Sequence, residues 1–254
     1  MRFAILGSGS KGNATLIQSD STTIMLDCGF TIKETERRLE RVGTKPAELS
    51  AILVTHEHGD HISGIGPFVR KYHIPVYMTR GSWIPHRMGN IPQHHFICCH
   101  SPFTIGDLTI TPFPVPHDAR EACQFTFQNS GKKLGVLTDT GMITPHIEEN
   151  LDGCDALILE ANHDLQMLRE GPYPPSLQAR VNSDLGHLNN QQSAALLKKI
   201  DTGRLQHLVV AHLSEKNNRP EHAINALNNA CQRPKEQIIV ADQELGLDWC
   251  EISI

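Results

Sequence analysis

The stretch Leu53-Val54-Thr55-His56-Glu57-His58-Gly59-Asp60-His61 decides the fold and the chemistry that we expect of this chain. Its first three residues are the end of a β-branched apolar run, residues 51–55, and this run predicts a buried strand. Three histidines and one aspartate follow within six positions. Imidazole and carboxylate groups are both ligand types for a borderline divalent metal. The first two histidines alternate and can bind one ion, while the aspartate and the last histidine lie beyond a glycine turn and can face a second. The stretch therefore predicts a dinuclear metal site, and a solvated histidine-rich loop is the alternative.

Length and composition indicate one globular domain. The chain has 254 residues, 39% of them hydrophobic and 20% charged, which is ample for a buried core. No linker or internal repeat divides it, so we expect residues 1–254 to form a single domain. The N-terminal apolar run is interrupted too early by Gly7 for a signal peptide, and no run approaches the roughly 20 residues of a membrane span. The seven cysteines lack disulfide-framework spacing, so we expect a cytoplasmic protein.

Charge and histidine content point to metal chemistry rather than to a basic nucleic-acid-binding surface. The chain has fifteen histidines and a formal net charge of −5. That charge gives no overall field that attracts nucleic acid, so a polyanion must be drawn by local patches or by bound metals. Tight non-specific DNA binding is disfavoured, but a phosphodiester active site is not.

Strand patterns dominate the chain and helices are mostly separate from them. We expect strands at residues 2–6, 14–18, 23–27, 51–55, 75–78, 108–113, 123–127, 133–138, 156–160, 208–211, 237–241 and 246–251. We expect helices at residues 31–42, after Pro67, and at 190–200 and 220–232. We expect surface loops with helical turns at 80–101 and an irregular insertion at 165–182. Two successive runs of strands followed by helices predict an α/β (α+β) fold in which two sheets pack together with helices outside.

Two further segments carry weaker signals. Residues 7–13 contain three glycines and two serines and predict a hairpin turn whose N–H groups can approach a phosphate. The helix expected after Thr31 has one apolar face and one basic face. The basic face carries Lys33, Arg37, Arg38 and Arg41. We expect this face to be solvated, with a nucleic-acid contact as the less common alternative.

Four ligands in one loop cannot complete two metal spheres, so further ligands must come from elsewhere in the chain. His117, Asp139 and His212 each follow a predicted apolar strand at its end. Any one of them alone is more often a satisfied polar group than a ligand. Because all three share this context, we expect them to complete the metal site.

The order of these seven residues resembles that of the metallo-β-lactamase superfamily over essentially the whole chain. The resemblance implies an αββα sandwich of two mixed sheets, with the metals at the edge where strand ends converge. Carried over by position, one ion is held by His56, His58 and His117, the other by Asp60, His61 and His212, and Asp139 bridges the two. The expected cofactors are two divalent ions, zinc first, with manganese or iron as alternatives.

Shorter motifs narrow the resemblance to the WalJ/YycJ group of metal-dependent nucleases, near the phosphodiesterase branch. They lie at residues 7–13, 159–164, 171–174, 186–188 and 212–218. This resemblance implies a phosphodiester hydrolase that uses a metal-bridging hydroxide, as a 5′→3′ exonuclease on DNA or RNA. The group is expected to have Gly-His-Leu-Ser where this chain has Gly186-His187-Leu188-Asn189, which removes a hydroxyl contact but keeps the histidine.

The catalytic residues expected beside the metals are Asp60, His187 and Glu160. His187 follows a glycine, precedes a helix start and is our candidate for the acid that protonates the leaving group, with Glu160 orienting it. A helix cap or an eighth metal ligand is the alternative for His187. Weaker candidates for substrate binding are Ser8, Ser10, His163 and Asn217. Lys11, Arg180, Lys216 and Arg219 can bind flanking phosphates, although solvation is the commoner role of such residues.

Two other functions stay open at this level. A thioester or lactone hydrolase of the glyoxalase II-like type needs an acid such as His187 less, because a thiolate leaves without a proton. A regulatory protein could use the metal site as a switch, although a purely binding role needs no open dinuclear centre. A nucleic acid or another phosphodiester is the expected partner, no membrane is expected, and a homodimer is expected by analogy alone.

Overall fold

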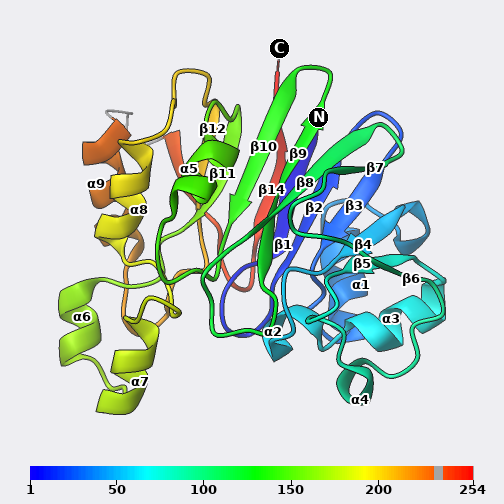
Figure 1. The fold of residues 1–254 in the computed structure, drawn as a ribbon, viewed down its shortest axis with the longest axis horizontal. Coiled ribbons are helices and arrows are strands. Elements are labelled where there is room, and N and C mark those ends of the chain that lie inside the picture. The colour runs from blue at the N-terminus through cyan, green and yellow to red at the C-terminus, as the bar shows by residue number, and fades with distance from the viewer. Residues whose placement is uncertain (232–236, 254) are drawn as a thin grey trace.

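Two seven-stranded β-sheets pack face to face in the computed structural model, which describes residues 1–231 and 237–253 (Figure 1). The first sheet has the order β14 (Leu247–Glu251), β1 (Arg2–Gly7), β2 (Ala14–Gln18), β3 (Thr23–Leu26), β4 (Ala51–Leu53), β5 (Val76–Met78) and β6 (His94–Phe96). The second has the order β13 (Ile238–Val240), β12 (His207–Ala211), β11 (Ala156–Glu160), β10 (Lys132–Leu137), β9 (Cys123–Asn129), β8 (Leu108–Pro114) and β7 (Phe103–Ile105).

Both sheets are mixed, and each changes from antiparallel to parallel pairing along its width. In the first sheet β14, β1, β2 and β3 pair antiparallel, and β3 to β6 pair parallel. In the second, β7 to β10 pair antiparallel and β10 to β13 parallel. The carboxyl ends of the parallel strands come together at the lower edge of the sandwich in Figure 1, where the connecting loops gather.

Helices cover the outer faces of both sheets, as Figure 1 shows. The connections between strands β3 and β6 of the first sheet contain α1 (Ile32–Arg41), the 3₁₀ turn Pro46–Glu48, α2 (Gly59–Ile62), α3 (Ile65–Tyr72) and α4 (Pro85–Met88). The second sheet carries α5 (Pro145–Leu151), α6 (Leu165–Glu170), α7 (Pro175–Val181), α8 (Asn190–Leu197) and α9 (Pro220–Cys231). The α/β sandwich predicted from the strand and helix order is confirmed. The predicted end of the last helix at Gln232 lies outside the described residues.

The alternation of side chains along the strands explains the layers. In β1, Phe3 and Ile5 point into the core between the sheets, whereas Ala4 and Leu6 pack against the helices of the outer layer. All four side chains are almost completely buried. A strand that is covered on both faces must be apolar on both, which is why the predicted strands are nearly continuous apolar runs.

Several short elements were missed in the sequence. Residues 165–182 were expected to be irregular but form α6 and α7. In residues 80–101, α4 is one of the expected helical turns, but the strand β6 was not predicted. The side chain of Asp164 caps α6, and Pro175 is the first residue of α7, so this proline begins a helix instead of breaking one. The strand β7 and the helix α5 were not predicted either.

The predicted solvation of the basic face of α1 is wrong for Arg38, and Arg41 is only partly solvated, with 25% of its side chain exposed. Lys33 and Arg37 are exposed, but the side chain of Arg38 is 2% exposed. Its Nη1 donates to the backbone carbonyls of Leu6 (2.7 Å) and Gln243 (2.9 Å), and its Nε pairs with Glu34. The position faces the strand ends of the first sheet, so the charge is buried where carbonyl groups can satisfy it.

None of the helices in residues 1–231 and 237–253 combines the length and the apolar character that a membrane span requires.

Candidate metal centre

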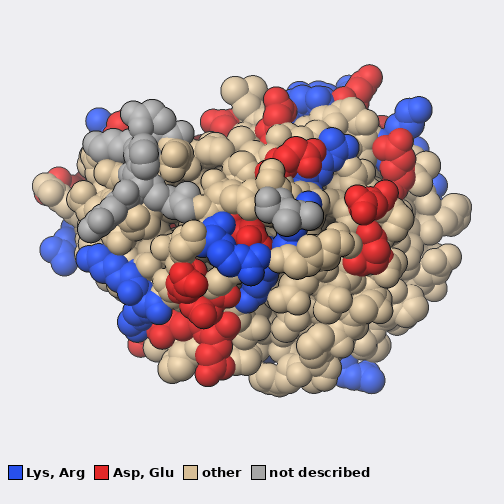
Figure 2. Space-filling model, turned by 90° about the horizontal axis from the view of Figure 1, so that it is seen from above, with Lys and Arg blue, Asp and Glu red and all other residues tan. Residues whose placement is uncertain are grey.

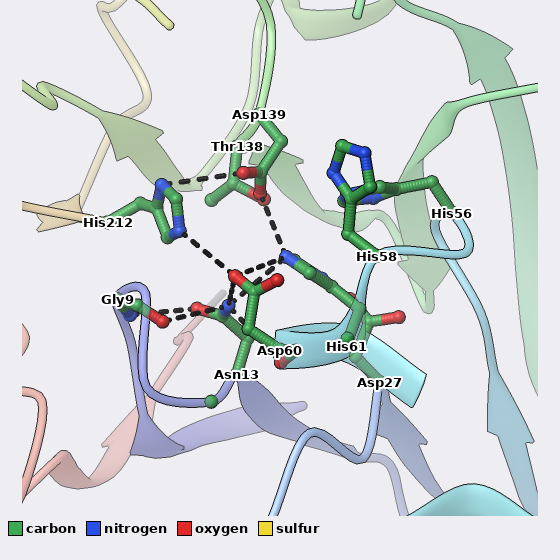
Figure 3. Close-up of polar contacts among 12 residues, drawn as sticks. Gly9, Asn13, Asp27, His56, His58, Asp60, His61, Thr138, Asp139 and His212 are labelled. Atoms are coloured by element: carbon green, nitrogen blue, oxygen red, sulfur yellow. Dashed lines mark hydrogen bonds and ion pairs between the residues drawn. The ribbon is translucent and has the colours of Figure 1, made fainter. Parts of the chain in front are cut away.

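The seven predicted ligands come together at the lower edge of the sandwich. Figure 3 labels six of them: His56, His58, Asp60, His61, Asp139 and His212. The loop after β4 supplies the first four, and α2 is a single turn that begins directly after His58. His117, Asp139 and His212 follow β8, β10 and β12, respectively. Asp139 and His212 have positive φ angles of 52° and 53°, so the backbone turns sharply where each side chain enters the site.

The first group of ligands consists of three histidines. Nδ1 of His58 lies 3.0 Å from Nε2 of His56 and 3.2 Å from Nε2 of His117. Nδ1 of His117 lies 3.1 Å from the carbonyl oxygen of Gly186 and can donate to it, which leaves the Nε2 lone pair free for a metal. Burial lowers the pKa of both His56 and His117, which favours the neutral imidazole that a metal ligand requires.

The second group consists of Asp60, His61 and His212. Oδ2 of Asp60 lies 3.4 Å from Nε2 of His61 and 3.8 Å from Nε2 of His212. Burial alone would raise the pKa of Asp60, but the two histidines hold it well below its ordinary value. Burial alone would lower the pKa of His212, but Asp139 and the other carboxylates raise it to about 10. The carboxylates thus require nearby positive charge, which protons or bound cations can supply.

Asp139 lies between the two groups. Its Oδ2 is 3.4 Å from Nε2 of His61, its Oδ1 is 3.4 Å from Nδ1 of His212, and it clusters with His56 and His61. Among the residues that the structure describes, Asp139 Oδ2 and His212 Nε2 are buried without a hydrogen-bond partner. Buried polar atoms without partners are costly, and a cation between them would satisfy both. The donor set therefore fits divalent metal ions.

A layer of polar residues behind the ligands was missed in the sequence. Oδ2 of Asp27 accepts from Nδ1 of His61 (2.8 Å) and from the hydroxyl of Thr55 (2.8 Å). Nδ2 of Asn13 lies 3.1 Å from Nε2 of His61 and 3.2 Å from Oδ2 of Asp60 (Figure 3). Asp27 stands at the end of an apolar strand. The same signal identified Asp139, so Asp27 could have been predicted from the sequence in the same way.

His187 and the buried Glu160 form a pair beside the ligands. Nδ1 of His187 lies 2.8 Å from Oε1 of Glu160, whose other oxygen accepts from the backbone N–H groups of Thr140 and Leu188. Burial lowers the pKa of His187, but Glu160 outweighs this effect and raises it above the ordinary value. Glu160 itself is completely buried, so it can position His187 but cannot touch a substrate. Because Asp139, Glu160, His187 and His212 also cluster closely, the geometry leaves the role of a further ligand open for His187.

The four weaker substrate candidates are placed differently. Ser10 is exposed and lines the cavity over the centre, whereas the hydroxyl of Ser8 accepts from the backbone N–H of His212 (2.9 Å). His163 and Asn217 are completely buried. Nε2 of His163 lies 3.2 Å from Oδ1 of Asn182, directly after α7, and Nδ2 of Asn217 lies 3.4 Å from the hydroxyl of Ser214. Neither side chain lines the cavity.

A cavity of about 360 Å³ opens over the centre. Its wall includes side chains of both ligand groups together with Ser10, Asp118, His187 and two arginines. A small polar substrate can thus reach the candidate ligands and His187 from one side.

Comparisons with known proteins agree with this arrangement. The family model described as "Beta-lactamase superfamily domain" matches residues 22–212, three quarters of the chain. The chain belongs to the β-lactamase superfamily. Among solved structures, the metallo-β-lactamase fold protein YhfI from Bacillus subtilis matches with a TM-score of 0.77 and 17% identity, over 98% of this chain and 99% of that one. The predicted superfamily and its metallo-β-lactamase fold are therefore confirmed.

Two curated relatives within this superfamily match over nearly full length. Exodeoxyribonuclease YycJ of Bacillus anthracis is 38% identical, over 88% of this chain and 86% of the relative. Exodeoxyribonuclease WalJ of Streptococcus pneumoniae serotype 2 (strain D39 / NCTC 7466) is 33% identical, over 98% and 92%, respectively. The resemblance to the WalJ/YycJ group is confirmed, and membership of the superfamily implies divalent metal ions at the clustered ligands.

Proposed function

We propose that this chain is a dinuclear metal-dependent phosphodiester hydrolase that degrades DNA from the 5′ end as an exonuclease. The names of YycJ and WalJ support exonuclease action on DNA, and RNA is the alternative substrate. Zinc is the proposed metal, with manganese or iron as alternatives. A single domain over residues 1–254, a cytoplasmic location and a homodimer stay predictions.

One observation carries the proposal: Asp139 clusters with residues of both ligand groups, and His187, held by the buried carboxylate of Glu160, lies beside them. We assign His56, His58 and His117 to one ion, Asp60, His61 and His212 to the other, and Asp139 to both. When bound, two such ions lower the pKa of water and neutralise the anionic oxygens of a phosphodiester. Asp60 is thus a ligand and part of the catalytic machinery.

His187 supplies what the ligands cannot, a proton for the leaving alkoxide. Its Nδ1 is engaged by Glu160, so Nε2 is the nitrogen available to the cavity that His187 lines. As the P–O bond breaks, the proton passes from this nitrogen to the leaving oxygen. Glu160 is a positioning residue, which holds the ring and stabilises its positive charge. A thioester substrate would have little use for this pair, which favours the phosphodiester.

The test compares two phosphodiesters that differ in leaving group. Metal-depleted protein is reconstituted with Zn²⁺ or Mn²⁺ and assayed on bis(p-nitrophenyl) phosphate and on a 5′-labelled DNA oligonucleotide. Asp139→Ala is expected to abolish both activities. His187→Ala is expected to lower DNA cleavage by about 10²–10⁴-fold, the usual contribution of a general acid. The loss on the nitrophenyl ester is expected to be smaller, because nitrophenolate leaves without a proton.

His146→Ala is the matched control, since this histidine lies on α5, is 45% exposed and does not line the cavity. Hydrolysis of a thioester without any cleavage of either phosphodiester would move the chain to the glyoxalase II-like alternative. Metal binding without hydrolysis of any of these substrates would favour the regulatory role.

A further inference from the structure

Two arginines from opposite halves of the chain line the cavity over the candidate metal centre. Arg87 belongs to α4 and Arg180 to α7, and Figure 1 shows these helices on either side of α2, which carries Asp60. Of the four basic residues that the sequence suggested for flanking phosphates, only Arg180 lines this cavity. Arg87 lies in the segment 80–101, which was expected to form surface loops with helical turns, and it was not among those four residues.

Arg87 is held by its neighbours but keeps most of its donors. Its Nη1 donates to the carbonyl oxygen of Glu57 (2.9 Å), two positions before Gly59. A Cβ atom added at Gly59 would lie 3.0 Å from Nη2 of Arg87, so the guanidinium packs directly over the first turn of α2. No carboxylate in the described part of the chain lies within ion-pair distance of it. The remaining N–H groups are therefore available to an anion.

Arg180 is fixed on the other side of the cavity by Asp118. Its Nε lies 2.5 Å from Oδ2 of Asp118, while 60% of its side chain is exposed. Oδ1 of Asp118 in turn lies 3.5 Å from Nε2 of His117 and 3.8 Å from Nε2 of His58. The ion pair thus places Arg180 next to the three-histidine group and leaves its terminal N–H groups for another acceptor.

The charges around the cavity show what these arginines add. Three aspartates line it, Asp60, Asp118 and Asp139, and Arg87 and Arg180 are the lysine and arginine side chains that line it among the described residues. The metal centre can neutralise the single charge of one phosphodiester, but further phosphates of a nucleic-acid strand need cations outside it. On the far end of the sandwich, the basic and acidic side chains of the described residues are interspersed (Figure 2).

We propose that Arg87 and Arg180 bind the backbone phosphates on either side of the scissile bond, so that the site selects a nucleic-acid strand over a small phosphodiester. The inference rests on the proposed function. Guanidinium groups suit this role because their planar array of donors matches phosphate oxygens. A purely structural role, in which the two residues only hold α4 and α7, makes different predictions about substrate preference and salt.

The experiment measures kcat/KM of the metal-reconstituted full chain on a single-stranded DNA oligonucleotide and on bis(p-nitrophenyl) phosphate. The ratio of the two values is expected to fall about tenfold in Arg87→Gln and in Arg180→Gln. The slope of log kcat/KM for DNA against log salt concentration is expected to become shallower by about 0.7 in each variant, as one phosphate contact predicts for a single strand. Arg169→Gln, an exposed position on α6 away from the cavity, is expected to change neither quantity.

Four outcomes overturn the inference. An unchanged ratio and salt slope in both variants would show that the arginines bind no phosphate. Equal losses on the two substrates, with the wild-type salt slope, would show that they only support the site. If the wild-type protein hydrolyses the nitrophenyl ester but does not cleave DNA, a nucleic-acid strand is excluded as substrate and the phosphodiesterase activity is retained. If the wild-type protein hydrolyses neither substrate, the proposed function is rejected as well.

Discussion

Oδ2 of Asp27 lies 2.8 Å from Nδ1 of His61, in the buried layer directly behind the candidate metal centre. The same carboxylate accepts from the backbone N–H (2.9 Å) and the hydroxyl of Thr55, so it is fixed on two sides. A proton on Nδ1 leaves the lone pair on Nε2, which faces Asp60 and Asp139 at 3.4 Å. Asp27 thereby selects the ring orientation and tautomer that a metal ligand needs.

Asp27→Asn is expected to weaken metal binding by about 10- to 100-fold, the usual cost of losing such a supporting carboxylate. Competition with a chromophoric chelator measures the affinity directly, without reference to catalysis. Asp20→Asn serves as the control, because Asp20 is exposed at a hairpin away from the centre. An unchanged affinity in Asp27→Asn would show that His61 needs no such support.

Glu160→Gln is expected to shift the pH dependence of DNA cleavage. Glu160 raises the pKa of His187, so the neutral amide lets that pKa fall and the imidazolium is lost at lower pH. Because a general acid acts only when it is protonated, the alkaline limb of the kcat profile is expected to move to lower pH, with kcat about 10- to 100-fold lower above it. Metal content is measured in parallel, since Oε1 of Glu160 also lies 3.2 Å from Nδ1 of His212. An alkaline limb that stays in place would exclude His187 as the acid.

Gly29→Ala is expected to displace the turn that carries Asp60. The new Cβ atom would lie 1.8 Å from the backbone oxygen of Asp60 and 2.8 Å from the backbone nitrogen of Asn13, so the backbone must move. We expect a loss of about 2 kcal/mol or more in the free energy of unfolding, measured by urea denaturation. Gly203→Ala is the control, because its Cβ would meet only the flexible carboxylate of Asp201 at 3.1 Å. Equal stabilities of the two variants would contradict the crowding that the structure shows.

Arg38→Ala is expected to lower the free energy of unfolding by about 3 kcal/mol, because it leaves the two buried carbonyl groups of Leu6 and Gln243 without the donor that Arg38 supplies. Arg37→Ala, one position earlier and 57% exposed, is expected to cost less than about 1 kcal/mol. Thermal or urea unfolding of the pair provides the comparison. Similar losses in both variants would mean that the buried position of Arg38 contributes nothing.

The sequence predicted the main strands well because burial on both faces demands long apolar runs. The strand Ala156–Glu160 was predicted with its observed ends, and Ala14–Gln18 likewise. The short helices α6 and α7 were missed because six or seven residues give too little periodicity to identify a helix. Arg38 was misplaced because the pattern of α1 shows which face is basic but not which carbonyl groups lie opposite it.

The sequence by itself determined the ligand types, their order along the chain and the family, because a metal centre at strand ends requires particular side chains at particular places. Only the tertiary structure decided which of these side chains meet. It placed Asp139 between His61 and His212, turned His163 and Asn217 away from the cavity, and brought Arg87 and Arg180 to it. The physical reason is that contacts between distant segments depend on how two sheets and their loops pack, which no local pattern of residues encodes.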